Sequence, residues 1–489
     1  MRASTPGVDR LARCESLLAW LEREGCEHAV RVGESSGASV GVFASRDVKR
    51  GEALIRCPVA CAMTARDTRP SPDDDDATAA FKAALDAARP RLDDAQRLRL
   101  FLLRERRLSE NPPERPGPPP GRWASYARSL PGDELLDILP LGWSREDLAR
   151  RLRGTPALDR ALEERAELER LERAARDAEG FSPLIDLGTA SSSEGAAAAT
   201  VSWAHAAYWS RAIALPLSAF HASSHSKKSG VSRAGSNRGQ PSLVPLLDLC
   251  NHSAGARTTL RARGSRFELV ADADVRRGAE VRIDYGAMGN AELLARHGFV
   301  IPNNPADTTR VTLREGDLDD DRKGGARGDG FEGGFEGALR PGGGSTEGGA
   351  FSFSCVLHRG VAAWGEVPDG LLEAARRFRG AGGDEEGDAG AVARWARREA
   401  RKTDAGEGGG GGGGGGETGG AALDDDARVL RDAGVGADAV AGFEATPGPR
   451  AEAAGRIVRA ARRALLLDLA EVLERTGGKE RGGDEAARA

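Results

Sequence analysis

The sequence predicts an α+β protein with a mainly-β core, a helical insertion in that core, and an all-helical C-terminal domain. Three observations lead to this expectation. Short β-rich runs occur at both ends of the first 300 residues, within 38–58 and 243–285. Apolar residues recur at helical spacing over much of 81–178. The same spacing returns at 451–473, far from the β-rich runs.

Composition places the chain among soluble intracellular proteins. Hydrophobic residues make up 39% of its 489 residues and charged residues 30%, and no apolar run approaches the ~18–20 residues of a membrane span. The net charge of −5 lacks the basic excess of a nucleic-acid-binding domain. Six scattered cysteines are typical of reduced thiols. We therefore expect neither a membrane nor a nucleic-acid partner.

The N-terminal part predicts a short helix and then a β-hairpin. The apolar stripe from Leu17 to Leu21 ends near Gly25. Two β-rich runs, 38–48 and 53–58, flank a turn at Lys49-Arg50-Gly51.

The pattern of apolar residues in the middle of the chain predicts helices. The run from Phe81 to Arg107 has helical periodicity, and Pro90 divides it into two helices. The segment 148–178 is dense in Leu, Arg and Glu and predicts one amphipathic helix. Another helix is expected over Val201 to Leu217, and it carries Arg211.

No metal site is expected from the cysteines and histidines. Cys57-x3-Cys61 lacks the second pair of ligands that a structural zinc site needs. The spacing of His205, His221 and His225 does not place three ligands on one helical face, and no carboxylate accompanies them in sequence.

The stretch from 243 to 285 combines buried runs with polar ends. An apolar run that includes Asp248 stops abruptly at Asn251-His252, which places polar side chains at the mouth of a buried element. Residues 267–271 alternate like a half-buried strand. The run 278–286 then has the pattern of a turn, a short strand and the hydroxyl of Tyr285.

Asn251-His252 followed by Tyr285 resembles the SET-domain methyltransferases. The motifs are most similar to those of the branch that contains Rubisco large-subunit lysine methyltransferase and actin-histidine methyltransferase. Ser210-Arg211-Ala212 and the run 290–307, with a helix capped at Gly298, resemble the same branch. In this family the Asn-His pair meets the tyrosine because the C-terminal strand threads beneath a preceding loop. The resemblance therefore implies a pseudoknot-like core.

The resemblance also implies a domain organisation. It places a SET catalytic domain at 18–300, with its helical insertion at about 68–200. A helical domain like the Rubisco-substrate-binding domain is expected over 305–480. That region contains a strand-like run at Thr309 to Leu313 and Gly-rich segments at 324–349 and 406–420.

The resemblance assigns roles to individual residues. Six residues are expected to bind the cofactor S-adenosylmethionine: Ala38, Ser39, Val40, Arg211, Asn251 and His252. Four are expected to bind the substrate: Arg211, Asp248, Tyr285 and His297. The catalytic residues among these are Tyr285 and His297. From the residues alone, Asp248 could instead cap the Asn-His loop, and Tyr285 could be a core aromatic at a strand end.

The chain departs from the family pattern at two places. It has Ser39-Val40-Gly41 where the family prefers Gly-Leu-Gly, which disfavours close backbone approach at Ser39. It has His297 where the family usually has tyrosine. If His297 lines the target channel, we expect a roomier channel and a titration near neutrality, because free imidazole has a pKa of ~6.5. The alternative is that His297 packs against Phe299.

The function implied is methyl transfer from S-adenosylmethionine to a lysine of a non-histone protein. Rubisco large subunit or another abundant enzyme is the expected target, and we expect a monomer in chloroplast or cytoplasm. Such a transfer is an in-line displacement that depends mostly on positioning. Histidine methylation by the same fold, and a catalytically silent interaction module, remain open as alternatives.

Overall fold

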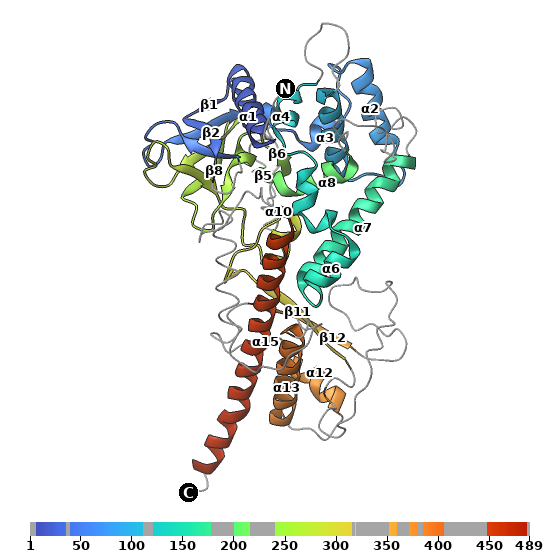
Figure 1. Cartoon of the computed structure of the whole chain (residues 1–489), viewed down its shortest axis with the longest axis vertical. Coiled ribbons are helices and arrows are strands. Elements are labelled where there is room, and N and C mark those ends of the chain that lie inside the picture. Colours follow the sequence, from blue (N-terminus) through green and yellow to red (C-terminus); the bar gives the residue numbers. More distant parts are fainter. Residues whose placement is uncertain are drawn as a thin grey trace, which may run out of the picture.

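The computed structural model combines β-sheets, a group of helices beside them and an elongated C-terminal part (Figure 1). It describes residues 6–35, 40–110, 121–177, 200–215, 240–314, 318, 352–358, 371–379, 385–404 and 447–486. The α+β class predicted from the sequence is confirmed.

The β core consists of two four-stranded sheets, with strand orders β1-β4-β9-β8 and β2-β3-β10-β7. Their strands are β1 (Glu27–His28), β2 (Val30–Glu34), β3 (Val40–Ala44), β4 (Ala53–Pro58), β7 (Asn251–His252), β8 (Thr258–Arg263), β9 (Arg266–Ala271) and β10 (Glu280–Ile283). The strand predicted at 267–271 lies in β9. The predicted hairpin over 38–58 is wrong, because β3 and β4 lie in different sheets.

Strands from before and after the helical insertion pair with one another in both sheets. In one sheet β4 pairs with β9, and Cys57 lies opposite Phe267. In the other, β10 lies between two strands, antiparallel to β3 and parallel to β7. These partners, distant in sequence, satisfy the backbone of β3 and β4 better than a local hairpin, because each strand gains a neighbour on both sides.

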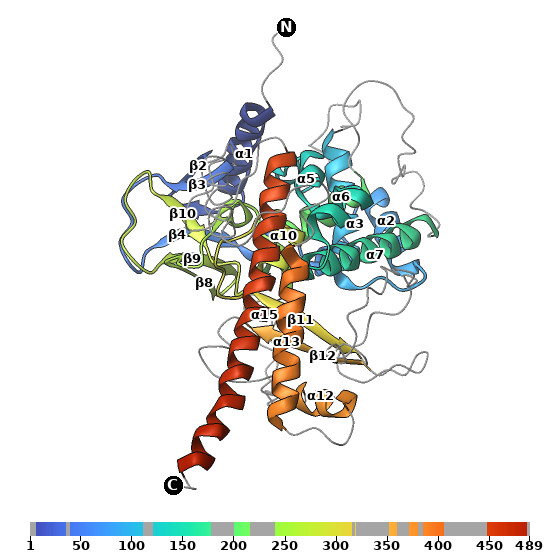
Figure 2. The ribbon, with the colours of Figure 1, turned by 60° about the horizontal axis from the view of Figure 1, so that its bottom comes forward.

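The helices between the two halves of the core lie to one side of the sheets (Figures 1 and 2). They are α2 (Asp76–Ala87), α3 (Asp94–Glu110), α4 (Ala124–Ser129), α5 (Glu134–Ile138), α6 (Arg145–Leu152), α7 (Pro156–Asp177) and α8 (Val201–Arg211), and α1 (Pro6–Arg23) precedes the first sheet. The division predicted at Pro90 is confirmed, because α2 ends before it and α3 begins after it.

Two predicted helices differ from those of the structure, one because it is interrupted and the other because it ends early. The helix predicted over 148–178 is two helices, α6 and α7. Gly154 between them has a φ of +69°, and Pro156 is a favourable first residue for α7. The helix predicted to reach Leu217 ends at Arg211. The next four residues form β5 (Ala212–Leu215), which pairs with β6 (Gln240–Leu243), so strand pairing overrides the local helical pattern.

The described residues of the C-terminal part form helices and one antiparallel pair of strands, so this part is not all-helical as the sequence predicted, because β11 and β12 satisfy each other's backbone. Its elements are β11 (Thr308–Arg314), β12 (Ser352–His358), α12 (Leu371–Arg379), α13 (Glu385–Asp404) and α15 (Pro447–Ala486). The strand predicted at Thr309 to Leu313 is confirmed as β11, whereas its partner β12 was not predicted. The Gly-rich segments at 324–349 and 406–420 lie outside the described residues.

The N-terminal half of α15 packs on α6 and α10 (Asn290–His297), which precede the C-terminal part in the chain. Ala454 and Ile457 of α15 share one apolar cluster with Leu148 and Leu294. Gly455 allows close approach, since a Cβ there would lie 2.6 Å from the carbonyl oxygen of Arg151. The helix that ends at His297 is therefore covered by the last helix of the structure.

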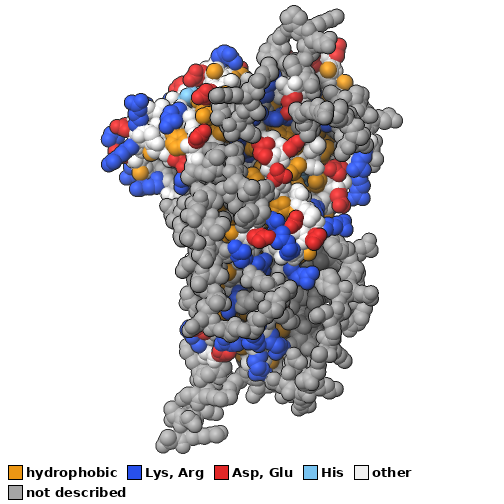
Figure 3. Space-filling view, in the orientation of Figure 1, with side chains coloured by type: hydrophobic (Ala, Val, Ile, Leu, Met, Phe, Trp, Pro, Cys, Tyr) orange, Lys and Arg blue, Asp and Glu red, His pale blue; other side chains and the backbone are white. Residues whose placement is uncertain are grey.

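The surface carries both signs of charge. On the face shown in Figure 3, basic and acidic side chains are interspersed over the described sheets and helices. Ion pairs between exposed side chains include Lys49 with Asp274 at 2.9 Å and Arg46 with Glu52 at 3.3 Å. Among the described helices, none is both long enough and apolar enough to cross a membrane.

Candidate active site

The parallel pairing of β7 with β10 brings the two polar sequence runs together. Asn251 lies opposite Arg282, and His252 lies opposite Ile283. Beyond the strand ends, the backbone N–H of Tyr285 donates to Nδ1 of His252 at 3.1 Å. The Asn-His pair and the tyrosine, separated in sequence by β8 and β9, are thus held by adjacent backbone.

The turn that leads into β7 is tightly constrained. Leu246 has a φ of +72°, a conformation that is unfavourable for leucine, and it is fully buried. It precedes the 3₁₀ turn η4 (Leu247–Leu249), whose middle residue is Asp248. Core packing around Leu246 therefore holds a strained backbone immediately before the polar residues of the site.

The side chain of Asn251 is held by a carboxylate. Its Nδ2 donates to Oε1 of Glu280 at 2.7 Å, and the same oxygen accepts from Oγ of Ser35 at 2.8 Å. Oε2 of Glu280 accepts from Nε and Nη2 of Arg282 at 2.9 and 2.7 Å. We call Glu280 and its three partners the Glu280 cluster.

The loop residues assigned to the cofactor lie only partly within the described chain. Ala38 and Ser39 lie outside the described residues, and Val40 is buried at the start of β3. The next residue, Gly41, faces the Glu280 cluster. A Cβ at Gly41 would lie 2.9 Å from Oε1 of Glu280 and 3.2 Å from Nδ2 of Asn251. The glycine of the sequence motif is therefore required for the packing of β3 against Asn251.

Four rings gather at the end of β10. The ring centroids of Tyr285 and His252 lie 5.0 Å apart, and those of Tyr285 and His297 lie 4.9 Å apart. Phe299 packs against this group, with its centroid 5.9 Å from that of His252. The ring of His297 also lies 6.0 Å from that of Phe299, as the packing alternative expects, whereas its place in the target channel stays a prediction.

The hydroxyl of Tyr285 is a hydrogen-bond donor. It donates to the carbonyl oxygen of Cys250 at 3.0 Å. Burial raises the pKa of Tyr285, and the nearby charge of Arg211 opposes this only in part. The phenol therefore stays protonated at physiological pH.

His297 does not titrate near neutrality, so that expectation was wrong. Burial lowers its pKa to about 3, and the positive charge of Arg296 acts in the same direction. A hydrogen bond with the backbone of Ser210 opposes the shift without cancelling it. The ring is neutral throughout the physiological range.

Asp248 is buried beneath the Asn-His pair. One carboxylate oxygen accepts from the hydroxyl of Tyr126 at 2.8 Å, and Nη1 of Arg211 donates to the backbone oxygen of Asp248 at 2.8 Å. The other carboxylate oxygen has no hydrogen-bond partner among the described residues. Burial raises the pKa of Asp248 to about 6, although Arg211 and Tyr126 act to lower it.

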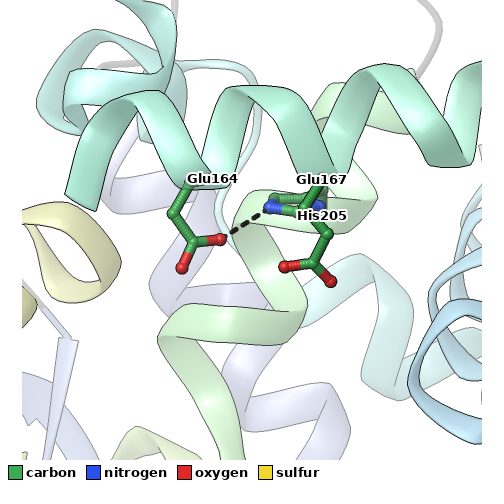
Figure 4. A group of neighbouring side chains, drawn as sticks. All are labelled: Glu164, Glu167 and His205. Atoms are coloured by element: carbon green, nitrogen blue, oxygen red, sulfur yellow. Dashed lines mark hydrogen bonds and ion pairs between the residues drawn. The ribbon is translucent and has the colours of Figure 1, made fainter. Parts of the chain in front are cut away.

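A second polar group lies in the helical insertion. Ligand atoms of Glu164, Glu167 and His205 lie within 4.8 Å of one another, so folding brings carboxylates to His205 that sequence spacing did not indicate (Figure 4). Arg99 donates to Nδ1 of His205 at 2.8 Å and to Glu167 at 2.5 Å. A guanidinium therefore supplies the positive charge here. His221 and His225 lie outside the described residues.

The protonation of His205 follows from these contacts. A guanidinium can only donate, so Nδ1 of His205 must accept and Nε2 must carry the proton. Nε2 donates in turn to Glu164 at 3.0 Å. Burial lowers the pKa of His205. Burial also opposes ionisation of Glu164, but the bond from His205 and the charge of Arg160 outweigh it and lower the pKa of Glu164.

The structure brings together seven of the nine residues assigned from the sequence. They are Val40, Arg211, Asp248, Asn251, His252, Tyr285 and His297. Their roles stay predictions. Sequence reasoning missed Glu280 and Tyr126 as their partners. One signal was available, because Glu280 and Arg282 are opposite charges two positions apart on a strand and so share one face.

Comparisons with known proteins give a family and a fold. A family model described as the SET domain matches residues 39–286, just over half of the chain. Actin-histidine N-methyltransferase from Canis lupus familiaris and from Homo sapiens are each 40% identical over 72 residues. That match covers 14% of this chain and only 12% of theirs.

Solved structures resemble the chain over nearly its whole length. The SET domain of LSMT bound to lysine and AdoHcy has a TM-score of 0.55 at 16% identity, and it covers 95% of this chain and 91% of its own. Rubisco LSMT bound to sinefungin and monomethyllysine has a TM-score of 0.56 at 17% identity, over 95% of this chain and 92% of its own. At this identity the likeness establishes the fold.

Proposed function

The chain belongs to the SET-domain family, and from this premise we propose that it is an S-adenosylmethionine-dependent protein methyltransferase. The observation that carries the proposal is the meeting of Asn251-His252 with Tyr285 at the end of the parallel β7–β10 pair. The pairing of β7 with β10 brings together two sequence motifs, Asn251-His252 and Tyr285, that the resemblance links to one function.

The residues of the site fit S-adenosylmethionine, which has a positive charge and several hydrogen-bond donors. The site offers acceptors in the carbonyl oxygen of Cys250, the amide of Asn251 and the Asp248 oxygen that no described residue binds. The electron-rich face of Tyr285 suits a cation. We propose that Val40, Arg211, Asn251 and His252 hold the cofactor. When bound, it supplies an electrophilic methyl group.

Tyr285 is proposed to orient the attacking nitrogen. Its hydroxyl hydrogen is directed to Cys250, so the oxygen lone pairs remain available to an N–H of the substrate. The rings of His252, His297 and Phe299 border this position and limit the access of water. A substrate lysine has a free pKa of ~10.4, and burial favours its neutral form, so no dedicated base is required.

We propose lysine of a non-histone protein as the target. Support comes from the likeness to Rubisco LSMT structures, some described as bound to lysine or methyllysine, across nearly the whole chain. Histidine is the second candidate, because the 72-residue match at 40% identity is to actin-histidine methyltransferases. His297 faces Tyr285, and we propose that both rings line the channel that would distinguish the two targets.

A labelling experiment tests both proposals. The protein is incubated with S-adenosylmethionine labelled in its methyl group and with a host-cell extract, and the labelled protein is identified by mass spectrometry. Methyl-lysine supports the first candidate and methyl-histidine the second. If calorimetry detects no binding of S-adenosylmethionine, the chain is a silent interaction module and the enzymatic proposal fails.

A further inference from the structure

We infer that Glu280 is a positioning residue that presents Asn251 to the cofactor, an inference that rests on the proposed function. Glu280 begins β10, and its side chain is 14% exposed. Each carboxylate oxygen has two donors, from Ser35 and Asn251 on one side and from two nitrogens of Arg282 on the other. Such a carboxylate cannot rotate without breaking several bonds at once.

The cluster determines which end of the Asn251 amide faces the ligand. A carboxylate only accepts hydrogen bonds here, so the NH₂ group of Asn251 must point toward Glu280. The carbonyl oxygen Oδ1 must then point away from the cluster. Without Glu280 no carboxylate would hold the NH₂ group on this side, and the amide could turn to present a donor instead of an acceptor.

Gly41 shows how closely this arrangement is packed. A single Cβ added at Gly41 would approach both Glu280 and Asn251 within 3.2 Å. The strand β3 therefore confines the pair from one side while β7 and β10 hold the backbone from the other. The amide is fixed before any ligand arrives, which reduces the entropy lost on binding.

The orientation matches the chemistry of the proposed cofactor. Its amino group, ribose hydroxyls and adenine amine are all donors, so an oriented acceptor at Oδ1 contributes affinity. Glu280 does not itself need to touch the cofactor. Its effect is expected to depend entirely on the presence of the Asn251 side chain.

Calorimetric titration with S-adenosylhomocysteine, which is not consumed, tests the inference. The proteins compared are the parent, Glu280→Ala, Glu280→Gln, Asn251→Ala and the double variant that combines Glu280→Ala with Asn251→Ala. We expect Glu280→Ala to weaken binding about 10-fold, as a lost oriented hydrogen bond does. Glu280→Gln keeps only one of the two acceptor oxygens, so it should still weaken binding, though less than Glu280→Ala does. The double variant should bind within about 2-fold of Asn251→Ala, because Glu280 then has nothing to orient.

Glu268→Ala is the matched control. Glu268 lies in the other sheet, its side chain is 9% exposed, and it also pairs with an arginine, Arg56, at 2.7 Å. Removing it should lower the melting temperature comparably but leave the affinity unchanged. The same loss of affinity in Glu268→Ala would mark a general structural effect and overturn the inference.

Two further outcomes would also overturn it. One is parental affinity in Glu280→Ala or, if that variant does not fold, parental affinity in Glu280→Gln. The other is a double variant whose loss equals the product of the two single losses, since Glu280 would then act independently of Asn251. A parent that does not bind S-adenosylhomocysteine would instead overturn the proposed function, and this inference with it.

Discussion

Two buried histidines show the difference between the helical insertion and the candidate site. Burial lowers the pKa of both His205 and His252. Both nitrogens of His205 are bound by charged side chains, Arg99 and Glu164. His252 instead accepts from the backbone of Tyr285 and packs against aromatic rings. A buried titratable group is thus a poor indicator of function by itself.

The two regions also differ in how their buried carboxylates are hydrogen-bonded. Around His205, both oxygens of Glu164 are occupied, one by His205 and the other by Arg160 and Arg296. At the candidate site, one oxygen of Asp248 has no partner among the described residues. We propose that the first region stabilises the fold and that the second binds a ligand. Variants in each region should separate these effects.

The largest effect is expected from Glu164→Ala, in the insertion. It leaves Arg160, Arg296 and His205 without their shared acceptor, so unfolding should become easier by about 3 kcal/mol. Thermal denaturation measures this. The control is Glu163→Ala, since Glu163 lies on the same helix and pairs with Arg160 but is exposed. It should change stability by less than about 0.5 kcal/mol. Equal melting temperatures for the two variants would contradict the comparison.

Tyr285→Phe should slow transfer by ~10²-fold or more, because it deletes a preorganised dipole while removing almost no volume. Cofactor affinity should persist. Single-turnover assays with labelled cofactor give the rate. Tyr208→Phe is the matched control, since Tyr208 is equally aromatic and fully buried beside Arg99 in the insertion. Parental turnover in Tyr285→Phe would assign that tyrosine a structural role only.

Asp248→Asn should change how stability depends on pH. The pKa of Asp248 is raised from 3.8 to about 6, so its contribution to stability is present below pH 3.8 and is lost as pH rises to 6. Asparagine can still accept from Tyr126 but does not ionise. Relative to the parent, the variant should therefore gain about 2–3 kcal/mol between pH 4 and pH 7.5. A stability difference that is constant over this range would exclude the raised pKa.

The smallest effect concerns His297→Tyr. With a pKa of about 3, His297 stays neutral, so parent and variant should have the same pH–rate profile from pH 6 to 8. The products should differ, because the shorter histidine leaves more room beside Tyr285 and favours states beyond monomethyl. Mass spectrometry of the product measures this distribution. Identical distributions would place His297 outside the target channel.

The pattern of short β-rich runs and helical periodicities predicted the fold class, and the resemblance to the SET-domain family predicted the convergence of Asn251-His252 with Tyr285. It did not predict that β3 and β4 belong to different sheets, since strand partners are set by contacts distant in sequence. The same limit hid the approach of Glu164 to His205. It also hid the low pKa of His297, because burial and the charge of Arg296 act only in the folded state.

The packing of α15 on α6 and α10 has a consequence for synthesis. A ribosome makes α10 long before α15, so Leu294 and Val300 have no cover from Ala454 and Ile457 while the nascent chain grows. The helix that ends at His297 therefore gains its final support only when α15 has emerged. A chain whose translation stops early would carry every residue of the candidate site and still present an apolar surface to chaperones.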